Sequence, residues 1–218
     1  LLLAVTHISE KSKIIVVCGP TGVGTTKFAI SLAQHFRAHI VGADSMQIYR
    51  HMDIGTPKLT EHGKAAVPHH MVDIVDPDQE YDAASYAQMA YDCVKELLNT
   101  GTLPLVVGGT GLYIKSLIYG LSEGAPADSA VRQKLQYRLS QSGLADLYQQ
   151  LVEKDPEAGQ RIHPNDSYRI LRALEVYEIT GQSIFVHHKK HGFRTPRFDV
   201  LYIGLKIPRE QLYKRIDQ

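Results

Sequence analysis

The sequence predicts an α/β fold in which a parallel sheet is flanked by helices and an all-helical domain is inserted. Short β-branched runs such as residues 13–18 are bounded by glycine, as is typical of buried parallel strands. Between these runs, apolar residues recur at helical spacing. Residues 122–196 show amphipathic helical patterns and no convincing strand. The predicted organisation is therefore a core at 1–121, a helical insertion at 122–196 and a return to the core at 197–218.

A glycine-rich turn at residues 19–26 follows the first predicted strand, and a helix is predicted next from the spacing of Phe28, Ala29, Leu32, Ala33 and Phe36. The turn matches the P-loop pattern G-x-x-x-x-G-K-[ST], typical of nucleotide- and ATP-binding proteins, except that Thr25 replaces the lysine. Thr26 fills the hydroxyl position and is the predicted magnesium ligand. Because backbone N–H groups converge at a helix N-terminus, the pattern predicts a phosphate site in a sheet of the P-loop type. A glycine turn without a ligand is the alternative.

The composition, 44% hydrophobic and 22% charged over 218 residues, is that of an ordinary soluble protein. No apolar run is long enough to cross a membrane. The apolar start at residues 1–7 lacks the basic leader and cleavage site of a signal peptide. Cys18 and Cys93 are expected to be reduced thiols rather than a disulfide framework. These features favour a cytoplasmic protein, with another reducing compartment as the alternative.

Charge is distributed unevenly along the chain. Residues 1–160 hold 13 Lys and Arg against 17 Asp and Glu, whereas residues 161–218 hold 11 against 6. A basic C-terminal quarter in a nearly neutral chain suggests contact with a polyanion. A solvated surface of mixed charge is the alternative.

A second strand is predicted at residues 39–42, and Asp44 follows it directly. Ligands of open α/β sheets bind beyond the carboxyl ends of the strands, so Asp44 is expected beside the first turn. There its carboxylate is a candidate general base or an indirect holder of magnesium. A helix cap is the other common role of an aspartate after a strand.

Further elements continue this pattern. Strands are predicted at 71–75 and 104–107, with a helix at 85–98 between them. A second glycine turn at 108–111 opens another predicted helix, which places Thr110 at the same edge of the sheet as Asp44.

Successive helices are predicted in the insertion, at 131–139, at 144–151 and from a cap at Asn165 and Asp166 to Gly181. Arg169 and Arg172 lie three residues apart on the last of these helices, and therefore on one face. Two guanidinium groups so placed suit the phosphates of a nucleic acid. Ion pairs with acids such as Glu175 are the alternative.

A basic, mobile loop is predicted at 187–194, a strand at 199–205, and a helix from Pro208. Because the chain ends inside that helix without a cap, the sequence is expected to be part of a longer protein.

These motifs together resemble the tRNA dimethylallyltransferase family. The motifs that carry the resemblance are GPT at 19–21, DSMQIY at 44–49, MDIGT at 52–56, PHH at 68–70, VGGTGLY at 107–113 and RIHPND at 161–166. The resemblance implies transfer of a dimethylallyl group from dimethylallyl diphosphate to N6 of the adenosine adjacent to the anticodon in tRNA. It implies no protein partner.

The resemblance also assigns roles by position. It implies that the diphosphate is bound by Gly19, Pro20, Thr21, Gly22, Val23, Gly24, Thr25 and Thr26. Thr21 and Arg215 would act on the reacting diphosphate, and Asp44 would be the general base. Predicted tRNA contacts are Asp44, Ser45, Met46, Gln47, Thr110, Arg132, Tyr168, Arg169, Ile170, Leu171 and Arg172. Thr25 departs from the lysine of the family, which predicts impaired turnover.

Two other functions are compatible with the sequence. One is an adenylate isopentenyltransferase or a P-loop nucleotide kinase, which would act on free nucleotides. The other is an inactive RNA-binding relative, which Thr25 favours.

Overall fold

The computed structural model describes residues 11–54, 56, 58, 65–121 and 128–217. The apolar start at 1–7 and the predicted beginning of the insertion at 122 lie outside these ranges. The chain forms two compact units, one from Leu1–Gly120 and Thr195–Gln218, the other from Leu121–Arg194. Each is described here by itself.

The first unit is built on a parallel sheet with the strand order β3-β2-β4-β1-β5. Its strands are β1 (Lys13–Cys18), β2 (His39–Gly42), β3 (His69–His70), β4 (Pro104–Gly108) and β5 (Asp199–Gly204). In this register Val16 of β1 lies opposite Val106 of β4 on one side and Tyr202 of β5 on the other. The predicted α/β fold is thus confirmed, and the chain returns to pair with its first strand after the helical insertion.

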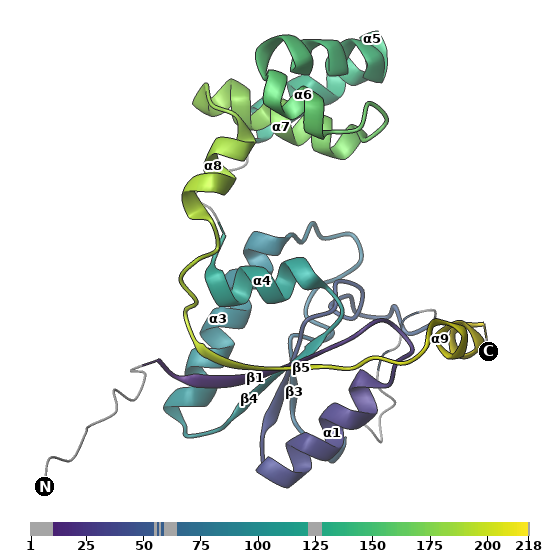
Figure 1. Cartoon of the computed structure of the whole chain (residues 1–218), viewed down its shortest axis with the longest axis vertical. Coiled ribbons are helices and arrows are strands. Elements are labelled where there is room, and N and C mark those ends of the chain that lie inside the picture. The colour runs from purple at the N-terminus through teal and green to yellow at the C-terminus, as the bar shows by residue number, and fades with distance from the viewer. Residues whose placement is uncertain (1–10, 55, 57, 59–64, 122–127, 218) are drawn as a thin grey trace, which may run out of the picture. The chain divides into compact units, whose positions relative to one another are not determined.

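Helices cover both faces of this sheet (Figure 1). α3 (Ala83–Asn99) and α4 (Gly111–Tyr119) pack against the face that includes Val16 and Val106. α1 (Thr25–Phe36) packs against the opposite face, which includes Val17 and Leu105. Burial on both faces explains the continuous apolar runs of these strands. A further helix, α9 (Arg209–Ile216), follows β5.

The stripe of α1 that packs against the sheet is formed by small side chains. Ala29 and Ala33 are fully buried, whereas Phe28 and Phe36 are 38% and 52% exposed. The small alanine side chains face the sheet, and the two rings at the edge of the stripe remain partly in solvent.

The strand predicted at 71–75 is wrong. Pairing with β2 ends at His70, because Met71 and Asp73 adopt left-handed conformations with φ of 61° and 55°. Extended backbone cannot include such residues. Only an isolated bridge between Val75 and Tyr49 follows.

Helices are the regular elements found among the described residues of the second unit. It consists of α5 (Ser129–Lys154), α6 (Pro156–Arg161), α7 (Ser167–Thr180) and α8 (Ile184–His191). α5 kinks at Gly143, whose φ of 79° separates the two helical segments expected from the sequence. The Asp166 side chain caps α7 through the Arg169 N–H, and Gly181 ends it in a left-handed conformation, both as predicted.

The predicted mobile loop at 187–194 is also wrong, because α8 occupies most of it. The Ser183 hydroxyl accepts a hydrogen bond from the Phe185 N–H at its start, and Gly192 ends it with φ of 58°. The loop was predicted because this segment is rich in basic residues, which are common in exposed loops. No helix in the described parts of the chain combines the length and apolar character needed to cross a membrane.

Candidate functional site

A cavity of about 380 Å³ lies at the carboxyl ends of the strands in the first unit. Its walls come from the first glycine turn (residues 19–26), from residues that follow β2 and β4, and from Lys58. The lining residues include Thr21, Gly24, Thr25, Thr26, Asp44, Gln47, Gly108 and Gly109. The first turn and Asp44 therefore share one hollow, which is the juxtaposition expected from the sheet topology.

Backbone conformation shapes the first glycine turn. Gly22 and Gly24 have φ of 83° and 101°, values that favour glycine. Gly24 is the N-cap of α1, and no side chain among the described residues caps this helix. The first N–H groups of α1 are thereby available for an anion at the positive end of the helix dipole. Gly19 allows close approach to the residue that follows β5, because a Cβ there would lie 3.0 Å from the Leu205 carbonyl oxygen.

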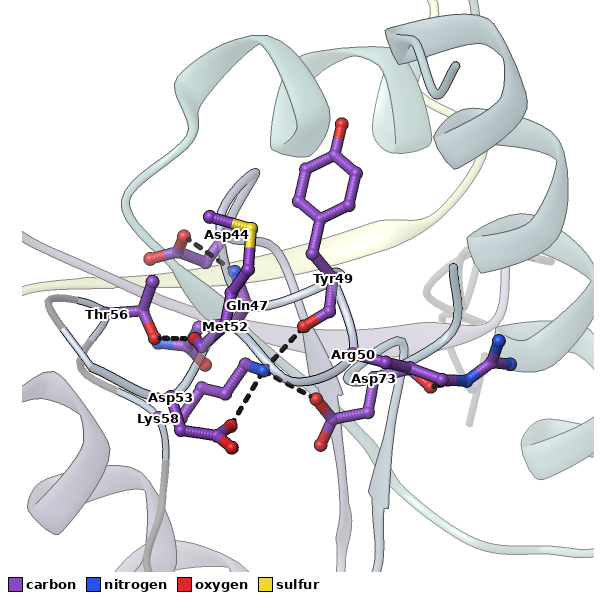
Figure 2. A network of polar contacts seen from close by, with 9 residues as sticks. All are labelled: Asp44, Gln47, Tyr49, Arg50, Met52, Asp53, Thr56, Lys58 and Asp73. Carbon is purple, nitrogen blue, oxygen red and sulfur yellow. Dashed lines mark hydrogen bonds and ion pairs between the residues drawn. The ribbon is translucent and has the colours of Figure 1, made fainter. Parts of the chain in front are cut away.

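Asp44 is half-buried and is held by its own loop (Figure 2). Its Oδ1 accepts hydrogen bonds from the Met46 N–H at 2.9 Å and the Gln47 N–H at 3.4 Å. Behind it, the buried Tyr86 hydroxyl donates to the Gly42 carbonyl oxygen at 2.9 Å and fixes the end of β2. Asp44 thus lines the cavity from a loop that hydrogen bonds hold in place. The two bonds to its carboxylate both use Oδ1.

The second glycine turn (residues 108–111) supports that loop. Gly108 lies against Ala43, where a Cβ would come within 2.1 Å of the carbonyl oxygen. The Thr110 N–H donates to the same Ala43 oxygen at 3.1 Å, and the Thr110 hydroxyl accepts from the Ser45 N–H at 2.9 Å. Thr110, predicted to contact tRNA, therefore contacts the backbone beside Asp44. Ser45 is half-buried and Met46 is 44% exposed.

Arg215 reaches the first turn from α9. Its guanidinium donates to the Val23 carbonyl oxygen at 3.3 Å. The helix also packs on Gly22, whose Cβ position is 3.1 Å from Ile216 Cγ1. The structure thus brings Arg215 to the turn, as the resemblance implied, through a backbone contact.

The predicted tRNA contacts of the second unit fall into three groups. Arg132 and Arg172 both pair with the buried carboxylate of Glu175, at 3.5 Å and 2.9 Å. Arg169 and Tyr168 are largely exposed, with 72% of the Arg169 side chain accessible. Ile170 is fully buried in the helical core and Leu171 packs against that core. The Ile170 side chain is therefore a core residue rather than a contact surface.

Lys58 is the feature of the site that the sequence did not reveal (Figure 2). Its side chain is only 3% exposed, and its ammonium pairs with Asp53 and Asp73. Burial lowers the pKa of Lys58, but its hydrogen bonds and attraction to Asp73 and Asp53 outweigh burial and raise the pKa above the ordinary value. A lysine among glycine, threonine and proline is typical of a solvated loop, and no local pattern signals its burial.

The fold and cavity define an α/β protein with a ligand site at the carboxyl edge of a parallel sheet. The IPP transferase family model matches residues 47–218, and the isopentenyl transferase model matches residues 12–64. The chain belongs to the IPP transferase family, which confirms the resemblance seen in its motifs.

Individual relatives agree. The chain is 50% identical over 207 residues to the tRNA dimethylallyltransferase of Desulfosudis oleivorans, covering 95% of this chain and 66% of that protein. With the corresponding enzyme of Syntrophobacter fumaroxidans it shares 48% identity over 204 residues, covering 94% of this chain and 60% of that protein. The chain thus spans about two thirds or less of these relatives.

Solved structures resemble it as well. The full-length tRNA isopentenylpyrophosphate transferase of Bacillus halodurans is 37% identical with a TM-score of 0.61, over 95% of this chain and 64% of that one. A eukaryotic dimethylallyltransferase that acts on tRNA is 31% identical with a TM-score of 0.79, over 94% of this chain and 51% of that one.

Proposed function

We propose that this chain carries the donor site and the base-activating site of an enzyme that transfers a dimethylallyl group from dimethylallyl diphosphate to N6 of the adenosine adjacent to the anticodon in tRNA. The observation that carries the proposal is the shared cavity of the first glycine turn and Asp44. Membership of the family and the tRNA-modifying relatives named above support the substrate class.

The reaction breaks the bond between the allylic carbon and the diphosphate oxygen and forms a bond from that carbon to N6. The electron pair of the broken bond leaves with pyrophosphate, whose growing charge is stabilised by N–H groups of the first turn and by the Thr21 hydroxyl. Arg215 adds a cation at the turn. The N6 proton passes to the Asp44 carboxylate as the new bond forms.

Magnesium fits the oxygen donors of this cavity. The Thr26 hydroxyl and the Asp44 carboxylate both line it, and hard oxygen ligands are those that magnesium prefers. When bound, the ion supplies charge neutralisation for the leaving diphosphate. The proposed holders are Thr26 directly and Asp44 indirectly, beside the phosphate-binding N–H groups.

The proposed tRNA surface of the helical unit is formed by Arg132, Tyr168, Arg169 and Arg172. Glu175 holds Arg132 and Arg172 in fixed positions, whereas Arg169 and Tyr168 are accessible for a phosphate and for stacking. Splayed bases of RNA loops can enter a cavity at a cost of a few kcal/mol.

A cytoplasmic location is part of the proposal, as tRNA is the acceptor.

The test is an incorporation assay with radiolabelled dimethylallyl diphosphate and either unmodified tRNA or AMP. We expect label in tRNA, formed roughly 10²–10³-fold faster by the Thr25→Lys variant than by the parent. Asp44→Asn should abolish incorporation, whereas pyrophosphate binding measured without magnesium should stay unchanged. Label in AMP but not in tRNA would identify an adenylate transferase. Binding of tRNA without label from either version would identify an inactive RNA-binding relative, which Thr25 favours.

A further inference from the structure

The ammonium of Lys58 is fully engaged (Figure 2). It donates to the Asp73 carboxylate at 2.7 Å, the Asp53 carboxylate at 3.0 Å and the Tyr49 carbonyl oxygen at 2.5 Å. A lysine ammonium has three N–H donors, so these three acceptors use all of them. Lys58 lines the cavity, yet it has no donor left for a ligand in this arrangement.

The three acceptors belong to segments on either side of β3 in sequence. Tyr49 and Asp53 belong to the chain that continues from Asp44, and Asp73 belongs to the turn after β3. Lys58 therefore links the loop that follows Asp44 to the turn that ends β3, because its ammonium bonds to both segments.

Backbone hydrogen bonds form the rest of this connection. The Gln47 carbonyl oxygen accepts from the Asp73 N–H at 3.1 Å, and the Ile48 carbonyl oxygen accepts from the Ile74 N–H at 2.8 Å. The Arg50 side chain donates to the carbonyl oxygens of Asp73 and Ile74 at 3.1 Å and 3.0 Å. Asp73 keeps a left-handed conformation within this network, which costs free energy unless its surroundings hold it.

Replacement of the missing P-loop lysine is the obvious alternative role for Lys58. Thr25 removes the cation expected at the outer phosphate, and Lys58 lines the same cavity. To serve there, the ammonium would have to leave two carboxylates. The Asp73 side chain, 28% exposed, would then lose its 2.7 Å contact with the Lys58 ammonium. The contacts thus favour a role in holding the chain.

We propose that Lys58 is a positioning residue that fixes residues 45–53, and through them Gln47 at the cavity, for recognition of the acceptor base. The proposal rests on the proposed function for the nature of the acceptor. Its structural part, the fixed loop, is independent of any substrate.

Amide hydrogen exchange tests the structural part on the ligand-free chain. Lys58→Met keeps the length of the side chain and removes its charge. We expect exchange of the Arg50, Asp73 and Ile74 amides to accelerate about tenfold, with β1 and β4 amides changing less than twofold. The control is Asp53→Asn, which should change these exchange rates much less. Asp53 is 68% exposed, so its ion pair with Lys58 is solvated and contributes little. If Lys58→Met unfolds the chain, Asp73→Asn makes the same comparison. Unchanged exchange at 47–50 and 73–75 would overturn the proposal.

Binding measurements then separate positioning from direct contact with phosphate. An unmodified anticodon stem-loop RNA and inorganic pyrophosphate are titrated into the parent and Lys58→Met. We expect the RNA Kd to rise about tenfold and the pyrophosphate Kd to stay within twofold, with partial recovery of RNA affinity in Lys58→Arg. A tenfold loss for pyrophosphate with RNA unchanged would make Lys58 a diphosphate ligand and overturn the proposal. Absence of RNA binding by the parent would refute the proposed function, while the exchange result would still decide the role of Lys58.

Discussion

The two glycine turns of the first unit follow the same sequence logic and reach opposite outcomes. In each, a buried strand ends in glycines and a helix begins. Both turns contribute residues to the cavity wall, but the first turn keeps left-handed glycines and lacks a capping side chain among the described residues. The second turn lies against Ala43, and its Thr110 bonds to the backbone around Asp44. The first turn leaves the first N–H groups of α1 without a side-chain cap, whereas Thr110 of the second turn hydrogen-bonds to the backbone around Asp44.

This difference teaches that strand–glycine–helix patterns define where a turn lies but not what it binds. In the proposed function, the second turn forms part of the cavity wall and holds the loop of Asp44. Mutations in the second turn should therefore lower mainly the free energy of unfolding. Mutations in the first turn should also change the affinity for anions.

The largest expected effect on folding is that of Gly108→Ala. The added methyl would lie 2.1 Å from the Ala43 carbonyl oxygen and 2.3 Å from its carbon, so backbone must move. We expect the free energy of unfolding to fall by about 3 kcal/mol in urea denaturation. Gly111→Ala is the control, since nothing lies within 4 Å of its Cβ position. Equal losses in both variants would contradict the bracing role.

Thr25→Lys should have the largest effect on anion binding. A charge-assisted hydrogen bond to the outer phosphate contributes about 1.5–3 kcal/mol. The pyrophosphate Kd measured by calorimetry should therefore decrease roughly 10–100-fold. Thr25→Met is the matched control, because the methionine side chain is similar in length to lysine but uncharged. If Thr25→Met binds as tightly as Thr25→Lys, charge at this position is not what the turn lacks.

Gly24→Ala tests the backbone of the first turn alone. Nothing lies within 4 Å of a Cβ at Gly24, so the cost comes from its φ of 101°. We expect a loss of about 1–2 kcal/mol in unfolding free energy, together with weaker pyrophosphate binding. Gly204→Ala is the control, because its Cβ also has open space and its φ is not positive. Unchanged pyrophosphate affinity in Gly24→Ala would argue against this turn as the anion site.

The smallest expected effect is that of Thr110→Val. It removes the acceptor of the Ser45 N–H and should lower the unfolding free energy by about 1 kcal/mol. Thr110→Ser keeps the hydroxyl and should retain most of the stability. Pyrophosphate affinity should not change in either variant, since the bond serves the second turn. A large loss of pyrophosphate affinity would erase the distinction between the turns.

Local patterns predicted much of the core but failed where tertiary contacts control the backbone. β1, α1 and β4 were predictable because burial on both faces and helical periodicity leave direct marks in the sequence. The run at 71–75 has strand-like residues, yet left-handed conformations at Met71 and Asp73 prevent it from extending. Those conformations coincide with hydrogen bonds to residues 47–50, which a local pattern cannot report.

The sequence by itself determined the parallel α/β core, the first glycine turn and the position of Asp44 at the end of a strand, since these depend on periodicity and on the conformational freedom of glycine. Only the tertiary structure decided that Lys58 is buried and that the second turn braces the chain. The physical reason is that burial of a charge or close approach of two backbones depends on partners distant in sequence. Asp73 for Lys58 and Ala43 for Gly108 are such partners.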